Sequence, residues 1–219
     1  MFRTAVVVGS IRANSLNRKI AEILIGMESE GLGLHLVEIG RLPLYNEDLE
    51  GDPPSEWQKF RASMTASNAL LFVTPEHNRS VPAALKNAID VGSRPFGASV
   101  WEGKPAGVIT VSPGAIGGFG ANHHLRQMFV FLNVLAMQQP EAYLGGASEF
   151  FDQNGALAAE ETRKFLNHFM KAYAEWVNRS LAPPQQSIVT RPIRAGRHGT
   201  FDESQSAPRI EGMTPTLKP

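Results

Sequence analysis

Residues 6–18 read VVVGSIRANSLNR, an apolar run that ends at Gly-Ser and passes through a short polar loop into an amphipathic stretch. The apolar or β-branched run from Thr4 to Val8 predicts a strand that is covered on both faces. From Leu16 onward apolar residues recur with helical spacing, and Ser15 stands at the position of an N-cap. The free N–H groups and the positive end of the helix dipole then face the loop, so this turn predicts a site for one phosphate monoester.

The side chains of this turn suit an anion. Its N–H and O–H donors include the four we assign to the site: Ser10, Arg12, Ser15 and Asn17. The alternative interpretation is an ordinary capped helix with a solvated loop, because most serine caps bind no ligand. We favour the anion site because all four donors fall within one strand-to-helix turn.

The composition is that of one globular α/β domain. At 219 residues, with 42% hydrophobic and 19% charged residues, the chain is long enough for a substantial core and short for two domains. A formal net charge of +0 gives no electrostatic argument for nucleic acid or a membrane surface as a partner. Cysteine is absent, which excludes disulfides, thiolate metal ligands and cysteine nucleophiles. No segment approaches the ~20 apolar residues of a membrane span, and we expect a cytoplasmic enzyme.

Predicted strands and helices alternate along the chain. Buried-type apolar runs predict strands at residues 4–8, 34–39, 69–73, 107–111 and 134–137. Amphipathic segments predict helices from Leu16, over residues 55–67, from a cap at Ser80 to about residue 91, over residues 121–132, and after the turn at Gly155. Repeated βα units imply a parallel sheet with helices on both faces. Five strands with a phosphate loop after the first predict a flavodoxin-like fold of strand order 2-1-3-4-5, in which the loops after strands one, three and four converge.

The end of the chain has a different composition. From about Ala182 prolines and glycines interrupt any periodicity, and apolar residues are too sparse to build a core. We therefore expect a flavodoxin-like domain at residues 1–182. Residues 183–219 are expected to form an extended or disordered tail that is dispensable for cofactor binding.

Three motifs carry a family resemblance. The first is Gly-Ser-x-Arg-x-x-Ser-x-Asn at residues 9–17, the second is PEHNRSVPAALKNAID at residues 75–90, and the third is LPLYNED at residues 42–48. Together they resemble the NADPH-dependent FMN reductase family, which includes quinone, azo-dye and chromate reductases on a flavodoxin-like fold. The resemblance covers residues 3 to 180, and the joint occurrence of the three motifs makes it specific.

The resemblance implies an FMN site made of three loops. The FMN phosphate would be held by helix amides and by Ser10, Arg12, Ser15, Leu16 and Asn17. The edge of the isoalloxazine ring would be lined, largely through backbone groups, by Pro75, Glu76, His77 and Asn78. The loop after the fourth strand would pass close to the pyrimidine end of the ring with Ser112, Gly114 and Gly117, because glycine lets a backbone approach a planar ring.

The resemblance also implies the reaction. NADPH or NADH would pass a hydride to flavin N5, and a quinone, azo compound or similar small-molecule acceptor would then take two electrons. The flavin supplies this chemistry, so no acid–base catalytic residue and no metal is expected. A homodimer or homotetramer is implied as well, because neighbouring subunits line the flavin site in this family.

Position 77 departs from the family pattern, which usually has tyrosine there. The departure leaves the fold and FMN binding as expected but bears on substrate preference and redox tuning. An imidazolium at the ring edge would stabilise the negative charge of reduced flavin, and its charge changes within the working pH range of most enzymes. The alternative is an exposed loop histidine without influence on the flavin.

Two other classes of function remain open at this stage. A flavodoxin-like electron carrier would share the fold, but such carriers are typically strongly acidic and this chain is neutral. A scaffold that has lost FMN and acts through its tail is the second. Signals for other kinds of site are missing. No G-x-G-x-x-G follows the first strand, as a dinucleotide-binding Rossmann site requires, and no G-x-S-x-G of a hydrolase is present. The adjacent His123 and His124 would point in different directions on a helix, so they do not predict a metal site.

Overall fold

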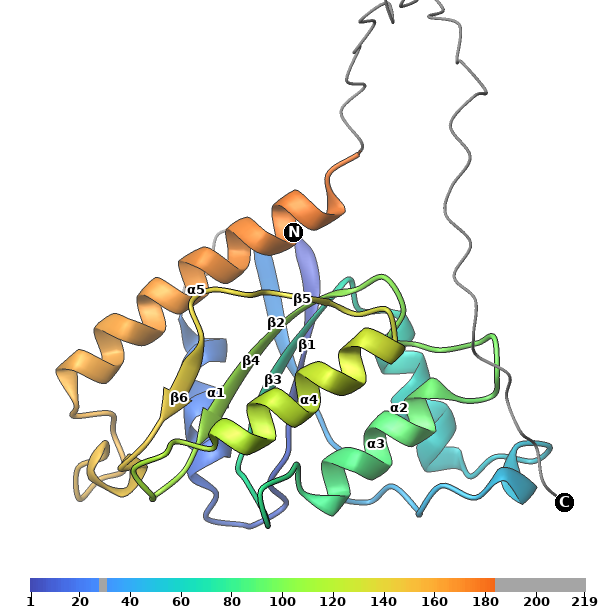
Figure 1. Cartoon of the computed structure of the whole chain (residues 1–219), viewed down its shortest axis with the longest axis horizontal. Coiled ribbons are helices and arrows are strands. Elements are labelled where there is room, and N and C mark those ends of the chain that lie inside the picture. The colour runs from blue at the N-terminus through green and yellow to red at the C-terminus, as the bar shows by residue number, and fades with distance from the viewer. Residues whose placement is uncertain (28–30, 184–219) are drawn as a thin grey trace, which may run out of the picture. The chain divides into compact units, whose positions relative to one another are not determined.

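A parallel sheet forms the centre of the computed structural model, which describes residues 1–27 and 31–183 (Figure 1). Its strands are β1 (Phe2–Val8), β2 (Leu32–Val37), β3 (Ala69–Thr74), β4 (Pro105–Val111), β5 (Leu135–Ala136) and β6 (Ala142–Leu144). The strand order is β2-β1-β3-β4-β5, with β6 also paired to β4. The predicted flavodoxin-like order 2-1-3-4-5 is thus confirmed, with one strand more than expected.

The extra strand divides the far edge of the sheet. β5 pairs with the beginning of β4 at Pro105↔Leu135, whereas β6 pairs with its end at Val111↔Leu144. The predicted strand at residues 134–137 is therefore only the first half of this edge. Sequence periodicity missed the second half because β6 has three residues and follows Pro140, which has no N–H to offer a ladder.

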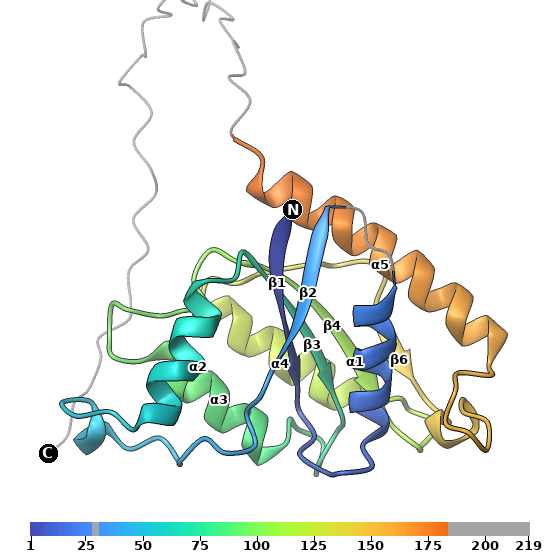
Figure 2. The same ribbon diagram turned by 180° about the vertical axis from the view of Figure 1, so that it is seen from behind.

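Helices cover both faces of the sheet (Figures 1 and 2). α1 (Leu16–Gly26) and α5 (Glu160–Leu181) pack on one face; α2 (Ser55–Thr65), α3 (Ala83–Ser93) and α4 (Phe119–Phe131) pack on the other. Strand residues alternate between the two cores: Val7 and Phe72 face α2, α3 and α4, while Val6 and Val73 face α1 and α5. This alternation explains why the central strands read as continuous apolar runs.

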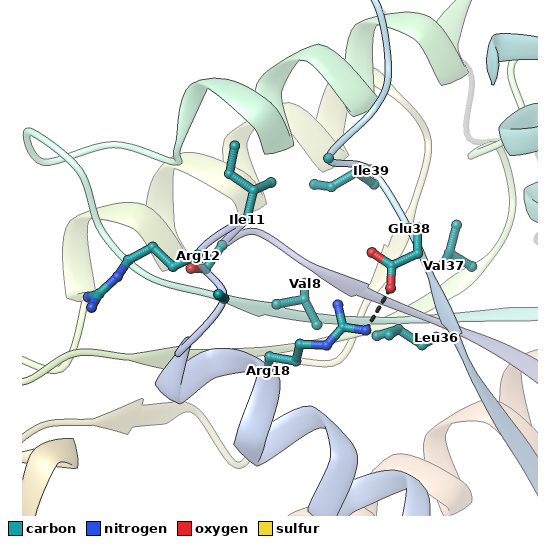
Figure 3. Close-up of a pocket in the computed structure, with 11 residues that line it drawn as sticks. Val8, Ile11, Arg12, Arg18, Leu36, Val37, Glu38 and Ile39 are labelled. Atoms are coloured by element: carbon teal, nitrogen blue, oxygen red, sulfur yellow. Dashed lines mark hydrogen bonds and ion pairs between the residues drawn. The ribbon is translucent and has the colours of Figure 1, made fainter.

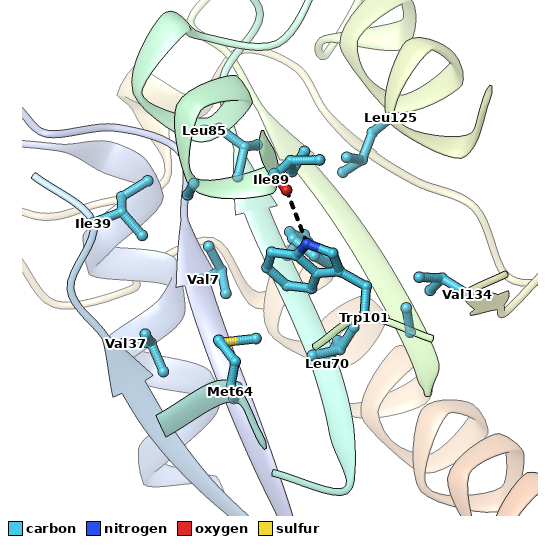
Figure 4. Packing of buried hydrophobic residues seen from close by; sticks show 14 of the residues in the cluster. Val7, Val37, Ile39, Met64, Leu70, Leu85, Ile89, Trp101, Leu125 and Val134 are labelled. Carbon is cyan, nitrogen blue, oxygen red and sulfur yellow. Dashed lines mark hydrogen bonds between the residues drawn. The ribbon is translucent and has the colours of Figure 1, made fainter. Parts of the chain in front are cut away.

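Trp101 closes the core under α2, α3 and α4 (Figure 4). Its side chain is 1% exposed, and its indole N–H donates to the Ile89 carbonyl at 2.9 Å. A methyl group at Gly92 would lie 2.5 Å from the indole ring, so the helix can approach Trp101 only because position 92 lacks a side chain. The segment before β4 therefore contributes to the core through Trp101.

One predicted helix start is wrong. Ser80 was expected to cap α3, but the helix begins at Ala83 with Pro82 at the N-cap position and no side-chain cap. The Ser80 backbone instead pairs with His77 in a turn, and this competing local pairing keeps it out of the helix.

Two further expectations concern the C-terminal tail and membrane-spanning segments. Residues 184–219, and with them nearly all of the expected tail, lie outside the part of the chain that the structure describes. Within the described part, no helix combines the length and the apolar character needed to cross a bilayer.

Candidate functional site

The loops after β1, β3, β4 and β6 meet at the carboxyl edge of the sheet. The first loop joins the end of β3 directly, since the Gly9 N–H donates to the Val73 carbonyl at 2.9 Å. A methyl group at Gly9 would lie only 2.1 Å from Thr74 Oγ1. Glycine at position 9 is therefore a packing requirement, and it brings the first motif against the second.

The first turn of α1 has a side-chain cap and free backbone N–H groups. Ser15 is the N-cap, 3% exposed, and its Oγ accepts from the Arg18 N–H at 3.2 Å. The predicted cap is confirmed. The first N–H groups of a helix, here including that of Leu16, have no intrahelical acceptor, and this first turn contains no acidic residue. Ser10 is half-buried and Arg12 is exposed, whereas Ser15 and Asn17 are buried.

Asn17 connects the first loop to the end of β4. Its side chain is buried, and its Nδ2 donates to the Val111 carbonyl at 3.3 Å. Its Oδ1 is buried without a hydrogen-bond partner in the structure. An unpaired buried acceptor costs free energy, so this oxygen is suited to a donor from a bound molecule.

The loop after β3 is a tight two-residue turn. The backbones of His77 and Ser80 exchange two hydrogen bonds of 2.9 Å, and the residues between them, Asn78 and Arg79, have φ of 50° and 63°. Two successive left-handed residues define a type I′ turn. The turn places His77 and Asn78 on the exposed rim of the site and leaves Pro75 half-buried below them.

Glu76 uses its side chain to hold two loops together. Its Oε2 accepts from the Ala121 N–H at 3.0 Å, and its Oε1 pairs with Arg79 Nη1 at 3.0 Å. The carboxylate thereby satisfies the first turn of α4, where Gly118 provides no side-chain cap. A methyl group at Gly120 would lie 2.9 Å from Glu76 Oε2, which explains the glycine at that position.

The loop after β4 packs on the loop after β6. Ser112 donates its N–H to the Leu144 carbonyl at 2.9 Å, and its Oγ accepts from the Gly114 N–H at 3.1 Å. Gly117 has φ of 67°, and a methyl group there would lie 2.7 Å from the Tyr143 carbonyl carbon. At Gly145 a methyl group would lie 2.4 Å from the Ala115 oxygen. Sequence reasoning missed the Gly145 loop, whose signal was a second glycine pair in the chain.

Asn87 is a further positioning residue that sequence reasoning missed. It belongs to the second motif but binds the backbone of the third: its Oδ1 accepts from the Tyr45 N–H at 2.8 Å. Its Nδ2 donates to the carbonyls of Leu42 and Pro43 at 3.2 and 3.1 Å. The joint occurrence of the two motifs was the signal that could have pointed to Asn87, because its side chain links them.

We expect Asn87→Ala to lower the free energy of unfolding by about 2–3 kcal/mol, because three partly buried hydrogen bonds are lost together. Urea denaturation followed by circular dichroism measures the loss. The matched control is Lys86→Ala, which removes an exposed ion pair with Asp90 and should change stability by less than about 1 kcal/mol. Equal losses in the two variants would contradict the role of Asn87.

Aromatic side chains border the site on α4 and β6. His123 Nε2 lies 3.0 Å from Tyr143 Oη, and Phe119 stacks near both rings. Burial raises the pKa of Tyr143 to about 12, and Glu141 adds to the shift. His124 turns instead to Ser80, with Nδ1 2.7 Å from Oγ. The two histidines thus have separate partners, and the described residues contain no cluster of metal ligands.

A cavity of about 190 Å³ opens on the other side of the first loop, at the carboxyl ends of β1 and β2 (Figure 3). Its lining includes Ser10 and Arg12 but no residue of the loops after β3 and β4. The Arg12 side chain extends away from the cavity in Figure 3. The cavity is therefore a separate feature from the meeting point of the four loops.

Comparisons with known proteins agree with this arrangement. Residues 2–149 match the family described as NADPH-dependent FMN reductase. A quinone reductase of Pseudomonas putida is 58% identical over 178 residues, which are 81% of this chain and 95% of that protein. A 2-hydroxy-1,4-benzoquinone reductase of Burkholderia sp. is 44% identical over 175 residues, 80% of this chain and 96% of that protein.

A solved structure shares the fold. The flavoenzyme NAD(P)H:(acceptor) oxidoreductase of Paracoccus denitrificans superposes with a TM-score of 0.77 at 39% identity, over 82% of this chain and 99% of that one. The resemblance carried by the three motifs is confirmed. The chain belongs to the NADPH-dependent FMN reductase family.

Proposed function

We propose that the protein is an FMN-dependent NAD(P)H oxidoreductase that reduces quinones. The observation that carries the proposal is the meeting of four loops at the carboxyl edge of the sheet, where open α/β sheets bind their ligands. Relatives at 58% and 44% identity are named as quinone reductases, which supports this class of acceptor.

The first loop suits the FMN phosphate. The N-terminus of α1 offers free amides, and Ser10, Ser15 and Arg12 add hydroxyl and guanidinium donors. We infer that the Leu16 amide completes this shell. Asn17 takes a different part: with Nδ2 committed to the Val111 carbonyl, its unpaired Oδ1 suits a hydroxyl donor of the ribityl chain.

The two other predicted loops suit the flavin ring. The type I′ turn fixes the backbone of His77 and Asn78, and Pro75 and Glu76 lead into it, so backbone groups can meet the ring edge without adjustment. Ser112, Gly114 and Gly117 supply a backbone with little side-chain bulk on the opposite side. Glu76 in addition fixes the distance between the two loops through the Ala121 amide.

The chain's contribution to the reaction is binding and orientation. Bound FMN supplies hydride acceptance from the nicotinamide and electron delivery to the acceptor. The first loop anchors the cofactor at its phosphate, and the loops after β3 and β4 set the position of the ring. We assign no acid–base residue to the reaction, and His77 remains the residue predicted to tune the flavin.

We further propose that residues 1–182 form the FMN-binding unit and that copies of it associate. Large apolar side chains on α4 support association, with Val130 84% and Phe131 87% exposed. A homodimer or homotetramer would cover them.

We expect the purified protein to be yellow, with one FMN per chain, and Arg12→Ala to weaken FMN binding by roughly 1–3 kcal/mol, since a charge-assisted contact to phosphate is lost. Quenching of flavin fluorescence measures the affinity. Arg41→Ala, an exposed arginine after β2, is the control and should bind FMN as the wild type does. Unchanged affinity in Arg12→Ala would overturn the phosphate site.

NADPH oxidation in the presence of a quinone separates the reductase from an electron carrier. The FMN-loaded protein should consume NADPH steadily, with the quinone reduced in equal amount. A carrier would hold FMN but oxidise NADPH no faster than free flavin does, and that result would contradict the proposed function.

A further inference from the structure

The cavity beside the first loop lies apart from the loops after β3 and β4, although it shares Ser10 and Arg12 with the proposed phosphate site. It lies between the loop of residues 10–13 and the segment of residues 36–40 that ends β2 and leaves the sheet (Figure 3). Pockets outside the carboxyl ends of parallel strands are where α/β proteins take nucleotides and similar ligands. A molecule in this cavity would touch the same loop that we propose to hold the FMN phosphate.

The cavity has a mixed lining, in which aliphatic side chains stand beside the polar groups of Ser10, Arg18 and Glu38. Five aliphatic side chains line it: Val8, Ile11, Leu36, Val37 and Ile39. Ile11 is 64% exposed, so an apolar side chain stands open to solvent in the middle of a polar loop. The volume of about 190 Å³ is below the ~300 Å³ of a site for a whole drug-sized ligand. These properties suit one flat, weakly polar part of a larger molecule, such as a purine ring.

An ion pair stands at the edge of this apolar surface. Arg18 Nη2 lies 2.7 Å from Glu38 Oε1 (Figure 3). Arg18 Nε also pairs with Glu22 at 3.1 Å. Arg18 and Glu38 both line the cavity, whereas Glu22 does not. The Glu38 side chain is 67% exposed, so its carboxylate can turn to another donor at little cost.

The position of this pair resembles that of a nucleotide ribose site. In dinucleotide-binding folds a carboxylate near the end of the second strand accepts from the ribose hydroxyls, and a nearby arginine takes the 2′-phosphate when one is present. Glu38 directly follows β2, and the guanidinium of Arg18 can bind a phosphate through two N–H groups.

We infer that this cavity receives the adenosine end of the reduced nicotinamide dinucleotide, with Glu38 binding the ribose of NADH and Arg18 binding the 2′-phosphate of NADPH. The inference rests on the proposed function and names how that function accommodates both nucleotides. The purine lies against Ile11 and its aliphatic neighbours. The carboxylate and the guanidinium each serve one nucleotide, so the pair gives dual specificity.

Calorimetric titration of the FMN-loaded protein with adenosine 2′,5′-bisphosphate and with AMP tests the inference without turnover. Arg18→Leu should weaken the bisphosphate about 10- to 100-fold, the range for a charge-assisted contact, and change AMP by less than about threefold. Glu38→Gln should have the reverse effect, weakening AMP by about 3- to 10-fold while the bisphosphate binds at least as tightly. Arg18→Lys should recover part of the bisphosphate affinity.

Glu22→Gln is the matched control, because Glu22 touches Arg18 from outside the cavity. It should leave both affinities unchanged. Equal effects of Arg18→Leu on the two fragments, or no binding of either fragment to the wild type at millimolar concentration, would overturn the inference. Steady NADPH oxidation by the wild type, measured beside the titrations, keeps the outcomes apart: its absence would contradict the proposed function itself.

Discussion

Gly9→Ala should lower the free energy of unfolding by roughly 3–4 kcal/mol and abolish FMN retention on purification. The added methyl group would lie 2.1 Å from Thr74 Oγ1 and 2.8 Å from Thr74 Cβ. Thr74 is fully buried, so the collision can be relieved only by moving the first loop away from β3, and overpacking of this kind is costly. Urea denaturation and the ratio of flavin to protein absorbance measure the two effects.

A double-mutant comparison identifies the cause. Thr74→Ala in the Gly9→Ala background removes the nearest atom but leaves the Cβ at 2.8 Å, so it should restore part of the lost stability. Gly26→Ala is the control, because nothing lies within 4 Å of the added methyl group, and it should change stability by less than about 1 kcal/mol. A Gly9→Ala variant as stable as the control would contradict the predicted clash between the added methyl group and Thr74.

Gly117→Ala should be at least as damaging, with an expected loss of about 3–5 kcal/mol. Two costs add at this position: φ of 67° is unfavourable for alanine, and the methyl group would meet the Tyr143 carbonyl carbon at 2.7 Å. The colliding atoms are backbone, which cannot rotate away. The loop after β4 must then separate from β6, and we expect FMN to be lost as well.

Gly114→Ala, in the same loop, is the matched control. A methyl group there meets only Ser112 Oγ at 3.5 Å, an ordinary contact. We expect a change in the free energy of unfolding below about 1 kcal/mol. Because Gly114 belongs to the proposed FMN site, it is a control for stability and not for FMN binding, and thermal unfolding of both variants without added FMN gives the comparison. Similar stability of the two variants would contradict the assigned packing of Gly117.

Much of the fold could be predicted because its signals are local. The central strands are buried on both faces, so Val6, Val7 and Val8 form an apolar run that is legible without any neighbour. Ser15 caps α1 through a bond to the amide three residues along the chain, and such a contact follows from spacing alone. Prediction fails where local signals compete. Ser80 is a residue type that commonly caps helices, but its backbone pairs with His77 in the type I′ turn, so it does not cap α3.

The sequence predicted where the candidate site lies in the fold, but not the contacts that its side chains make. The donors around Ser15 and the glycines after β4 stand out in the sequence, so their place at the carboxyl edge follows from the order of strands. The side chain of Glu76 was not expected to reach α4, and Asn17 was not expected to bind the end of β4. Both contacts join residues distant in sequence, whose approach depends on how the loops pack.

The sequence by itself determined the strand order, the capped turn after β1 and the family, because these depend on periodicity, on a cap and on three motifs within short segments. Only the tertiary structure decided that Gly9 and Gly117 are packing requirements, that Asn87 joins two motifs, and that Arg18 and Glu38 meet beside a cavity. Contacts such as that between Asn87 and Tyr45 span 42 positions. Burial of the two apolar faces of the sheet brings such residues together, and no local pattern records which of them will meet.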